Sequence, residues 1–334
     1  MNKEGRRAER RDLRFSRRIQ GESEKVTRTA LRKNHSRRFR ITGWQLACAV
    51  VEFLLASAVY GQEASIRFVP VTRQVVEGRL NKYAGDDARR ERTLMGLFAE
   101  AGCGEESLSE MPVSGWPLPN VICTLPGDSG RTIIVGAHYD HVPTGDGVVD
   151  NWSGASLLPS LYQALKDEPR RHTYVFVGFS EEERGMVGSK FYVQQMTEAQ
   201  KDLTDAMVNM DVLGLAPSED WWSYADRRLR AKLIYIADQL KLPISAVDIA
   251  EVGSSDSVEF GAVNIPSITI HSLSQKTWDA HILQPRKDAI SEIRMDDYYQ
   301  TYRLVAAYLA YLDYSTIKRE PVERKSLRKS GPPK

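Results

Sequence analysis

Short apolar segments alternate with amphipathic segments from residue 120 to residue 312, and this alternation restricts the chain to few folds. Five apolar runs have the length of buried strands, and the segments between them carry apolar residues at helical spacing. Buried strands that alternate with helices are typical of a mainly parallel sheet covered on both faces. We therefore expect a three-layer α/β fold, in which a mixed, mainly parallel β-sheet is flanked by helices. The expected strands are Asn120–Leu125, Arg131–Ala137, Thr173–Phe179, Ala206–Val212 and Ile265–Ile270, and the expected helices are Ser153–Leu165, Val187–Met196, Arg228–Leu240 and Asp296–Leu312.

A segment of five residues, Pro126-Gly127-Asp128-Ser129-Gly130, separates the first two expected strands. Pro and Gly in such a short connection are typical of a hairpin-like turn. We therefore expect these two strands to lie side by side.

Charge divides the chain into three parts. Residues 1–41 contain 15 Lys and Arg against 5 Asp and Glu, and the last twenty residues contain 7 against 2. Subtracting these surpluses of +10 and +5 from the net charge of +2 leaves −13 for residues 42–314. The isoelectric point of 8.3 therefore reflects the ends of the chain and gives no support for a nucleic-acid partner. We expect a leader at 1–63, a single domain at 64–314 and a basic, disordered tail at 315–334.

An apolar run, Ile41–Gly61, follows the basic residues directly and ends near Ala56-Ser57-Ala58. A positive flank, a short apolar core and small residues at the end are typical of an export signal. Glu52 lies in the middle of the run and would be costly at the centre of a bilayer. We therefore expect a cleaved signal and an exported protein. The alternative is a membrane anchor formed by residues 41–61, which would then be the only contact with a membrane.

Cys103 and Cys123 lie within the expected domain. In an oxidising compartment they could form a disulfide, but the sequence does not establish the geometry that a disulfide requires. Two buried free thiols are the alternative.

Polar side chains that suit a metal ion follow or interrupt three of the expected strands. His138 and Asp140 follow the second strand, the glutamates of residues 181–183 follow the third, and Asp211 interrupts the fourth. Ligands of such sheets bind at the carboxyl ends of the strands. Imidazole and carboxylate groups are ligands that zinc accepts.

Several carboxylates can be buried together only where a cation compensates their charge. Two divalent ions about 3.5–4 Å apart would do so, and they would acidify a water molecule and polarise a carbonyl group. A further carboxylate that is not a ligand could transfer the proton of that water to a leaving amine. The residues therefore indicate metal-assisted hydrolysis without naming a substrate.

Several motifs together resemble the M28 family of zinc aminopeptidases. They are Gly136-Ala137-His138-Tyr139-Asp140-His141, Asp150-Asn151 with Ser153-Gly154, Glu182-Glu183 with Gly185, Gly188 and Ser189, Val208-Asn209-Met210-Asp211, and Ser255-Asp256 with Asn264-Ile265-Pro266. The resemblance implies that His138 and Asp211 hold one zinc ion, that Asp150 bridges both ions and that Glu183 binds the second. It also implies that Glu182 is the general base. Asp140 would orient His138, as an outer partner of a metal-bound imidazole usually does.

Two positions stay open within this resemblance. The family pattern of glycines selects Glu182 and Glu183 from three consecutive glutamates, and Glu181 then stands where the family usually has a small residue. Asp256 either caps the helix that begins there or lies beside the metal ligands.

The last zinc ligand of the family is a histidine four residues before an aspartate. Here the residue four before Asp288 is Gln284, while His281 lies three residues earlier and His271 ends the last strand. We favour His281 as the ligand, because loop length varies more readily than ligand chemistry. Two zinc ions are expected, or one if no histidine reaches the second site.

The function that the resemblance implies is removal of amino-terminal residues from peptides with a free amino terminus. Glutaminyl cyclase, a single-zinc aminoacyltransferase with the same fold, is the first alternative. A receptor-like domain without catalytic activity is the second. Carboxypeptidase and dipeptidase specificities also remain open, because these enzymes share the metal core.

Overall fold

The computed structural model describes residues 67–248, 253–279 and 285–315. The strands of this part are β1 (Leu108–Met111), β2 (Asn120–Leu125), β3 (Thr132–His138), β4 (Thr173–Phe179), β5 (Thr204–Met210), β6 (Glu219–Trp221), β7 (Ser245–Val247) and β8 (Ser267–His271). The helices are α3 (Arg73–Leu80), α4 (Asp87–Ala101), α5 (Ser153–Ala155), α6 (Leu158–Leu165), α7 (Val187–Gln195), α8 (Glu198–Leu203), α9 (Arg227–Leu240), α10 (Ser257–Ala262), α11 (Gln275–Thr277) and α12 (Met295–Tyr314). The predictions for residues 1–63, including the apolar segment 41–61, and for residues 316–334 lie outside the described residues.

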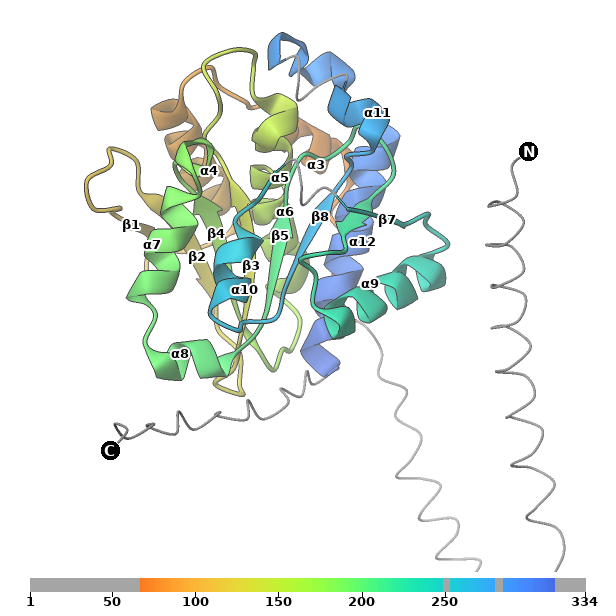
Figure 1. Ribbon diagram of the computed structural model, residues 1–334. Coiled ribbons are helices and arrows are strands. Elements are labelled where there is room, and N and C mark those ends of the chain that lie inside the picture. Colours follow the sequence, from red (N-terminus) through yellow and green to blue (C-terminus); the bar gives the residue numbers. More distant parts are fainter. Residues whose placement is uncertain (1–66, 249–252, 280–284, 316–334) are drawn as a thin grey trace, which may run out of the picture. The chain divides into compact units, whose positions relative to one another are not determined.

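The strands form one sheet in the order β1-β2-β4-β3-β5-β8-β6-β7 (Figure 1). The four central strands β4, β3, β5 and β8 are parallel to one another. Antiparallel pairing occurs toward the edges, where β2 pairs with β1 and β4, and β6 pairs with β8. The expected mixed, mainly parallel sheet is therefore confirmed.

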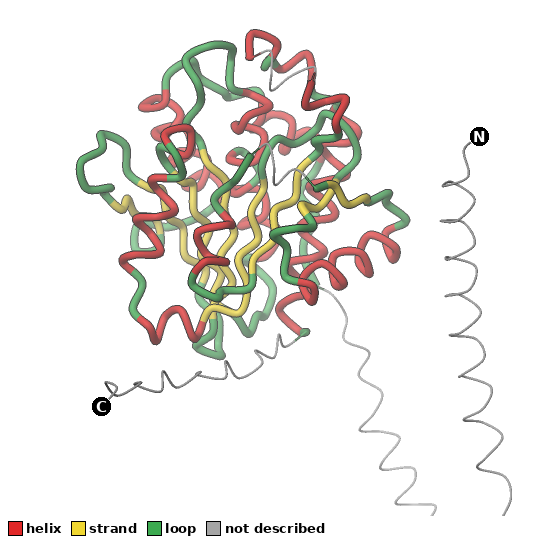
Figure 2. Tube along the Cα trace, in the orientation of Figure 1, coloured by secondary structure: helices red, strands yellow, loops and turns green. Residues whose placement is uncertain are grey.

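Helices cover both faces of the sheet, as Figure 2 shows. Along β3 the buried side chains alternate, so that Ile133 and Val135 belong to one apolar cluster and Ile134 to another. The larger cluster contains side chains of α3, α4, α6, α9 and α12. The smaller one contains Val193 of α7 and Phe260 of α10. The sheet thus lies between two helical layers, which confirms the three-layer architecture.

The expected pairing of the first two strands is wrong. β4 lies between β2 and β3, and the turn 126–130 crosses the start of β4 instead of closing a hairpin. The Ser129 amide donates to the Arg171 carbonyl at 2.7 Å, and the Gly127 amide donates to the Thr173 hydroxyl at 3.1 Å. Five residues are long enough to pass over one intervening strand, which requires a span of about 10 Å.

The helix expected at Ser153–Leu165 is divided into α5 and α6. Pro159 stands in the first turn of α6. A proline has no N–H for the hydrogen bond to the preceding turn, so it is accepted at the start of a helix but not in its interior. The other expected helices agree with the structure to within two residues.

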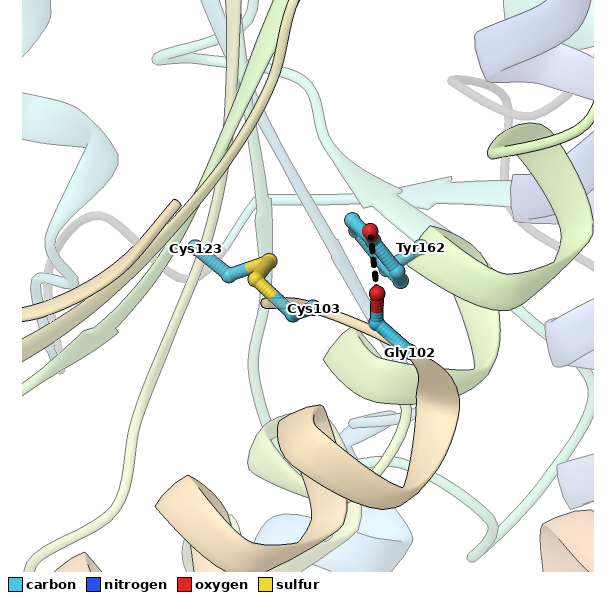
Figure 3. The surroundings of a disulfide bond; sticks show 4 residues. All are labelled: Gly102, Cys103, Cys123 and Tyr162. Carbon is cyan, nitrogen blue, oxygen red and sulfur yellow. Dashed lines mark hydrogen bonds between the residues drawn. A yellow bond between two sulfur atoms is a disulfide. The ribbon is translucent and has the colours of Figure 1, made fainter. Parts of the chain in front are cut away.

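A disulfide joins Cys103 to Cys123 and so ties the segment after α4 to β2 (Figure 3). Beside it, the Tyr162 hydroxyl of α6 donates to the Gly102 carbonyl at 3.0 Å. The two cysteines are 20 residues apart, and closing a loop of that size in the unfolded chain stabilises a fold by about 3 kcal/mol. The pairing that the sequence left open is therefore present.

None of the helices in the described ranges is both long enough and apolar enough to cross a bilayer.

A buried Asp–His–Asp cluster ties four elements together at the amino-terminal ends of β4 and β5. His172 lies with its Nε2 3.0 Å from Asp205 Oδ2 and its Nδ1 3.1 Å from Asp313 Oδ1. Arg131, just before β3, also pairs with Asp205. Asp313 comes from the end of α12, so the cluster links that helix to the sheet.

We expect this cluster to make stability depend on pH. Burial alone would lower the pKa of His172, but its hydrogen bonds to Asp205 and Asp313 outweigh burial and raise it. The stabilisation is therefore complete below the unfolded value of about 6.5 and is lost as the pH rises through the folded value. Burial alone would raise the pKa of Asp205, but its hydrogen bonds with Arg131 and His172 lower it to about 2, so this carboxylate loses its contribution only in strong acid.

The measurement is urea unfolding of the wild type and His172→Gln between pH 5 and pH 9. The variant should be about 3 kcal/mol less stable near pH 5.5, and the difference should shrink toward pH 9. Taking the difference cancels the titration of all other groups. A difference that stays constant across this range would show that folding does not shift the pKa of His172.

Candidate metal centre

The carboxyl ends of three neighbouring parallel strands form the candidate site. β3 lies between β4 and β5, so their ends meet at one edge of the sheet (Figure 1). His138 is the last residue of β3, Asp211 follows β5 directly, and Glu182 and Glu183 begin a short helix after β4. The parallel register therefore brings together residues that are up to 73 positions apart in the sequence.

Three of the predicted metal ligands lie within direct reach of one ion. His138 Nε2 is 3.2 Å from Asp150 Oδ1 and 3.4 Å from Asp211 Oδ1. One possible ligand atom from each of these three residues lies within 4.8 Å of the other two. His138 is buried, whereas Asp150 and Asp211 are half-buried.

The electrostatics of the cluster fit a divalent cation. Glu183 Oε1 and Asp211 Oδ1 are buried and accept no hydrogen bond from the described residues. Burial and the neighbouring Asp150 carboxylate raise the pKa of Glu183 to about 8. Burial also raises the pKa of Asp150. Carboxylates that repel one another and lack donors are stabilised by a metal ion, and imidazole with carboxylates is a donor set that zinc accepts.

Asp140 connects the imidazole to the glutamates. Its two oxygens accept hydrogen bonds from the amides of Glu182 at 3.0 Å and Glu183 at 3.1 Å. Its Oδ1 also lies 3.5 Å from His138 Nδ1, and its carbonyl oxygen lies 3.2 Å from the same nitrogen. Asp140 therefore orients the ring so that Nε2 faces Asp150 and Asp211.

Asn151 fixes Asp150 relative to Asp211. Its amide nitrogen donates to the Met210 carbonyl at 2.9 Å, and its Oδ1 accepts from the Val212 amide at 3.2 Å. These two groups lie on either side of Asp211 in the chain. The Asn151 side chain, next to Asp150 in the chain, is thus hydrogen-bonded to the backbone on both sides of Asp211.

Asp288 holds the other side of the Asp150 loop. Its carboxylate accepts the amide protons of Val149 at 2.6 Å and Asp150 at 3.2 Å. Burial raises its pKa to about 6 even though these amides lower it. From the sequence, Asp288 serves only to locate the last histidine ligand, and this role is not predicted. A contact between residues 138 positions apart leaves no local pattern in the sequence.

Asp211 is oriented by a chain of two hydrogen bonds. The Ser255 hydroxyl donates to Asp211 Oδ2 at 2.6 Å and accepts from the Asn209 amide at 2.7 Å. Asp256, the next residue, makes no hydrogen bond that caps α10. Burial, with the nearby carboxylates of Asp211 and Asp140, raises the pKa of Asp256 to about 7. Of the two readings of Asp256, the structure therefore supports the position beside the cluster.

The three consecutive glutamates face different surroundings. Burial raises the pKa of Glu182, and Asp256, Asp211 and Asp150 raise it further. Glu181 instead has Asp140 and Asp87 as its acidic neighbours. Glu182 and Glu183 therefore share the cluster around His138, while Glu181 lies toward α4.

His281 and Gln284 lie outside the described residues. The remaining candidate for the last ligand, His271, is buried at the end of β8. Its Nδ1 accepts the Leu273 amide proton at 2.9 Å, and burial lowers its pKa to about 4. Its Nδ1 is therefore occupied by the backbone, while its buried Nε2 has no hydrogen-bond partner among the described residues.

A model of peptidase family M28 matches residues 120–309 of the chain. This segment is more than half of the 334 residues, and it contains every candidate residue described above.

Known proteins resemble the chain in sequence or in fold. Aminopeptidase YwaD of Bacillus subtilis is 27% identical over 194 residues, which are 56% of this chain and 42% of that protein. LapA of Legionella pneumophila matches with a TM-score of 0.62 and 18% identity over 85% of this chain and 80% of its own. A glutaminyl cyclase of an Acidobacteriales bacterium matches with a TM-score of 0.60 and 12% identity over 72% of this chain and 93% of its own. The two structural matches establish a common fold, and the chain spans less than half of the length of the B. subtilis aminopeptidase.

Proposed function

Because this chain belongs to peptidase family M28, we propose that it is a zinc-dependent aminopeptidase, which removes the residue at the free amino terminus of a peptide. The observation that carries the proposal is the cluster of His138, Asp150 and Asp211 at the ends of adjacent strands, with Glu182 beside it. The similarity to the B. subtilis aminopeptidase supports the choice of substrate end.

The donor atoms suggest how zinc would be held. His138 and Asp211 would bind one ion, Asp150 would reach both ions, and Glu183 would bind the second. The sequence adds His281 as the last ligand of the second ion. When bound, zinc would polarise the carbonyl of the scissile bond and acidify the attacking water.

The residues of the chain supply the proton transfer and the orientation. Glu182 accepts the proton of the attacking water and delivers it to the leaving amine. Asp140 keeps the His138 ring and the backbone of Glu182 in place through the contacts described above. The surplus of carboxylates around the cluster attracts the ammonium group of a free amino terminus.

We further propose that the protein is exported and acts on peptides outside the cytoplasm. The disulfide between Cys103 and Cys123 supports this location, because disulfides persist in oxidising compartments. The apolar run after the basic leader supports it as well.

The experiment that tests the function compares the products that the zinc-loaded protein releases from four kinds of substrate. We expect release of a free amino acid from aminoacyl-nitroanilides and from a peptide with a free amino terminus, and no release from the same peptide after acetylation. Release of ammonia from a peptide with amino-terminal Gln would favour the cyclase, which shares its fold with this chain over 93% of its own length. Zinc binding without any turnover would favour a receptor-like domain.

A further inference from the structure

Arg90 of α4 is fully buried, and its guanidinium donates its hydrogen bonds to backbone carbonyls. Its Nη1 donates to the carbonyl of Gly147 at 2.8 Å and of Tyr139 at 3.4 Å. Its Nη2 donates to the Asp146 carbonyl, and its Nε donates to the Ala84 carbonyl at 2.8 Å. A buried cation is costly, so a guanidinium bonded to four carbonyls needs an explanation.

Three of the four bonded carbonyls, those of Tyr139, Asp146 and Gly147, belong to the two ends of the loop that separates two predicted metal ligands. Tyr139 follows His138 directly, and Gly147 precedes Asp150 by three residues. Asp288 and Asn151 hold only the Asp150 end of this loop. Arg90 also donates to a carbonyl at the His138 end, so its guanidinium links the two ends of the loop.

The loop is shaped to receive the guanidinium. Gly147 has a φ of 58°, and a Cβ atom there would lie 2.7 Å from Arg90 Nη2 and 2.4 Å from His141 Cβ. The guanidinium also lies over the Trp152 ring, 5.9 Å from its centroid. One helical turn earlier, Asp87 pairs with His141 Nδ1 at 2.6 Å, so α4 contacts the loop at two points.

We propose that Arg90 is a positioning residue that holds His138 and Asp150 in the geometry that binds the metal before the metal arrives. This inference rests on the proposed function, because it assumes that the cluster binds zinc. Held in place beforehand, the ligands lose less conformational freedom when the ion binds. If Arg90 acted only through its charge, removing that charge would strengthen zinc binding, because a positive charge beside the site weakens cation binding.

The test measures zinc dissociation constants by chelator competition, using full-length protein whose folding is verified by circular dichroism. Arg90→Lys keeps the charge but loses the fork of donors, and Arg90→Met loses both. We expect zinc to bind about 10- to 100-fold more weakly to each variant, with part of the activity restored by excess zinc. Arg89→Gln is the matched control, because Arg89 is adjacent but exposed and should leave the affinity unchanged.

Gly147→Ala disturbs the contact between Arg90 and the loop from the loop side. It is the test variant if the Arg90 variants do not fold. It should weaken zinc binding in the same way. Wild-type affinity in Arg90→Lys, tighter binding in Arg90→Met, or no zinc binding by the wild type would overturn the inference. If the wild type binds zinc but hydrolyses no peptide, the proposed function fails while the affinity comparison still tests Arg90.

Discussion

Glu182→Gln is expected to lower kcat about 10³-fold or more while the zinc content and KM stay close to wild-type values. The amide has the size of the carboxylate but cannot accept a proton. Glu182 is proposed as the general base and not as one of the zinc ligands, so its replacement should leave metal binding intact. Burial raises the pKa of Glu182 well above its ordinary value, and bound cations would moderate this rise. The measurement combines steady-state kinetics on an aminoacyl-nitroanilide with a metal assay of the same sample.

Glu181→Gln is the matched control for this prediction. Glu181 precedes Glu182 but has a left-handed backbone, with φ of 56°, and its acidic neighbours are Asp140 and Asp87. We expect its replacement to change kcat by only a few-fold. If Glu181→Gln abolishes turnover and Glu182→Gln does not, the general base is one residue earlier than proposed.

The central part of the fold could be predicted from the sequence because its strands are long and apolar on both faces. Such runs as Thr173–Phe179 are typical of parallel strands between helices. The order of the strands could not be predicted in the same way. The short turn 126–130 suggested that the strands on either side of it pair, but β4 lies between them. β6 and β7 have three residues each, which is too few for a period to be read.

Some residues of the candidate site could likewise be predicted from the sequence, and others could not. His138, Asp211 and Glu182 follow apolar strands, so the parallel sheet alone predicts that they meet. Asp150 lies in a loop, and only the resemblance to a family pointed to it. The groups that hold these residues could not be predicted, because Arg90 and Asp288 reach the Asp150 loop from distant parts of the chain.

Asp150→Asn is expected to lower zinc affinity by at least about 100-fold and to reduce activity in proportion. Asp150 Oδ1 lies 3.2 Å from His138 Nε2, and Asp150 is the ligand proposed to reach both ions. The amide keeps the shape of the side chain but removes the charge that attracts the metal. The same change should stabilise the metal-free protein, because burial and like charge already raise the pKa values of Asp150 and Glu183.

Thermal unfolding with and without zinc separates these two effects. Zinc should raise the Tm of the wild type and leave that of Asp150→Asn nearly unchanged. Without metal, Asp150→Asn should unfold at the same temperature as the wild type or at a higher one. Asp146→Asn is the matched control, because Asp146 is an exposed residue of the same loop whose carbonyl, not its side chain, contacts Arg90. A variant that is less stable than the wild type without metal, and that still gains stability from zinc, would mean that the Asp150 carboxylate supports the loop instead of binding the ion.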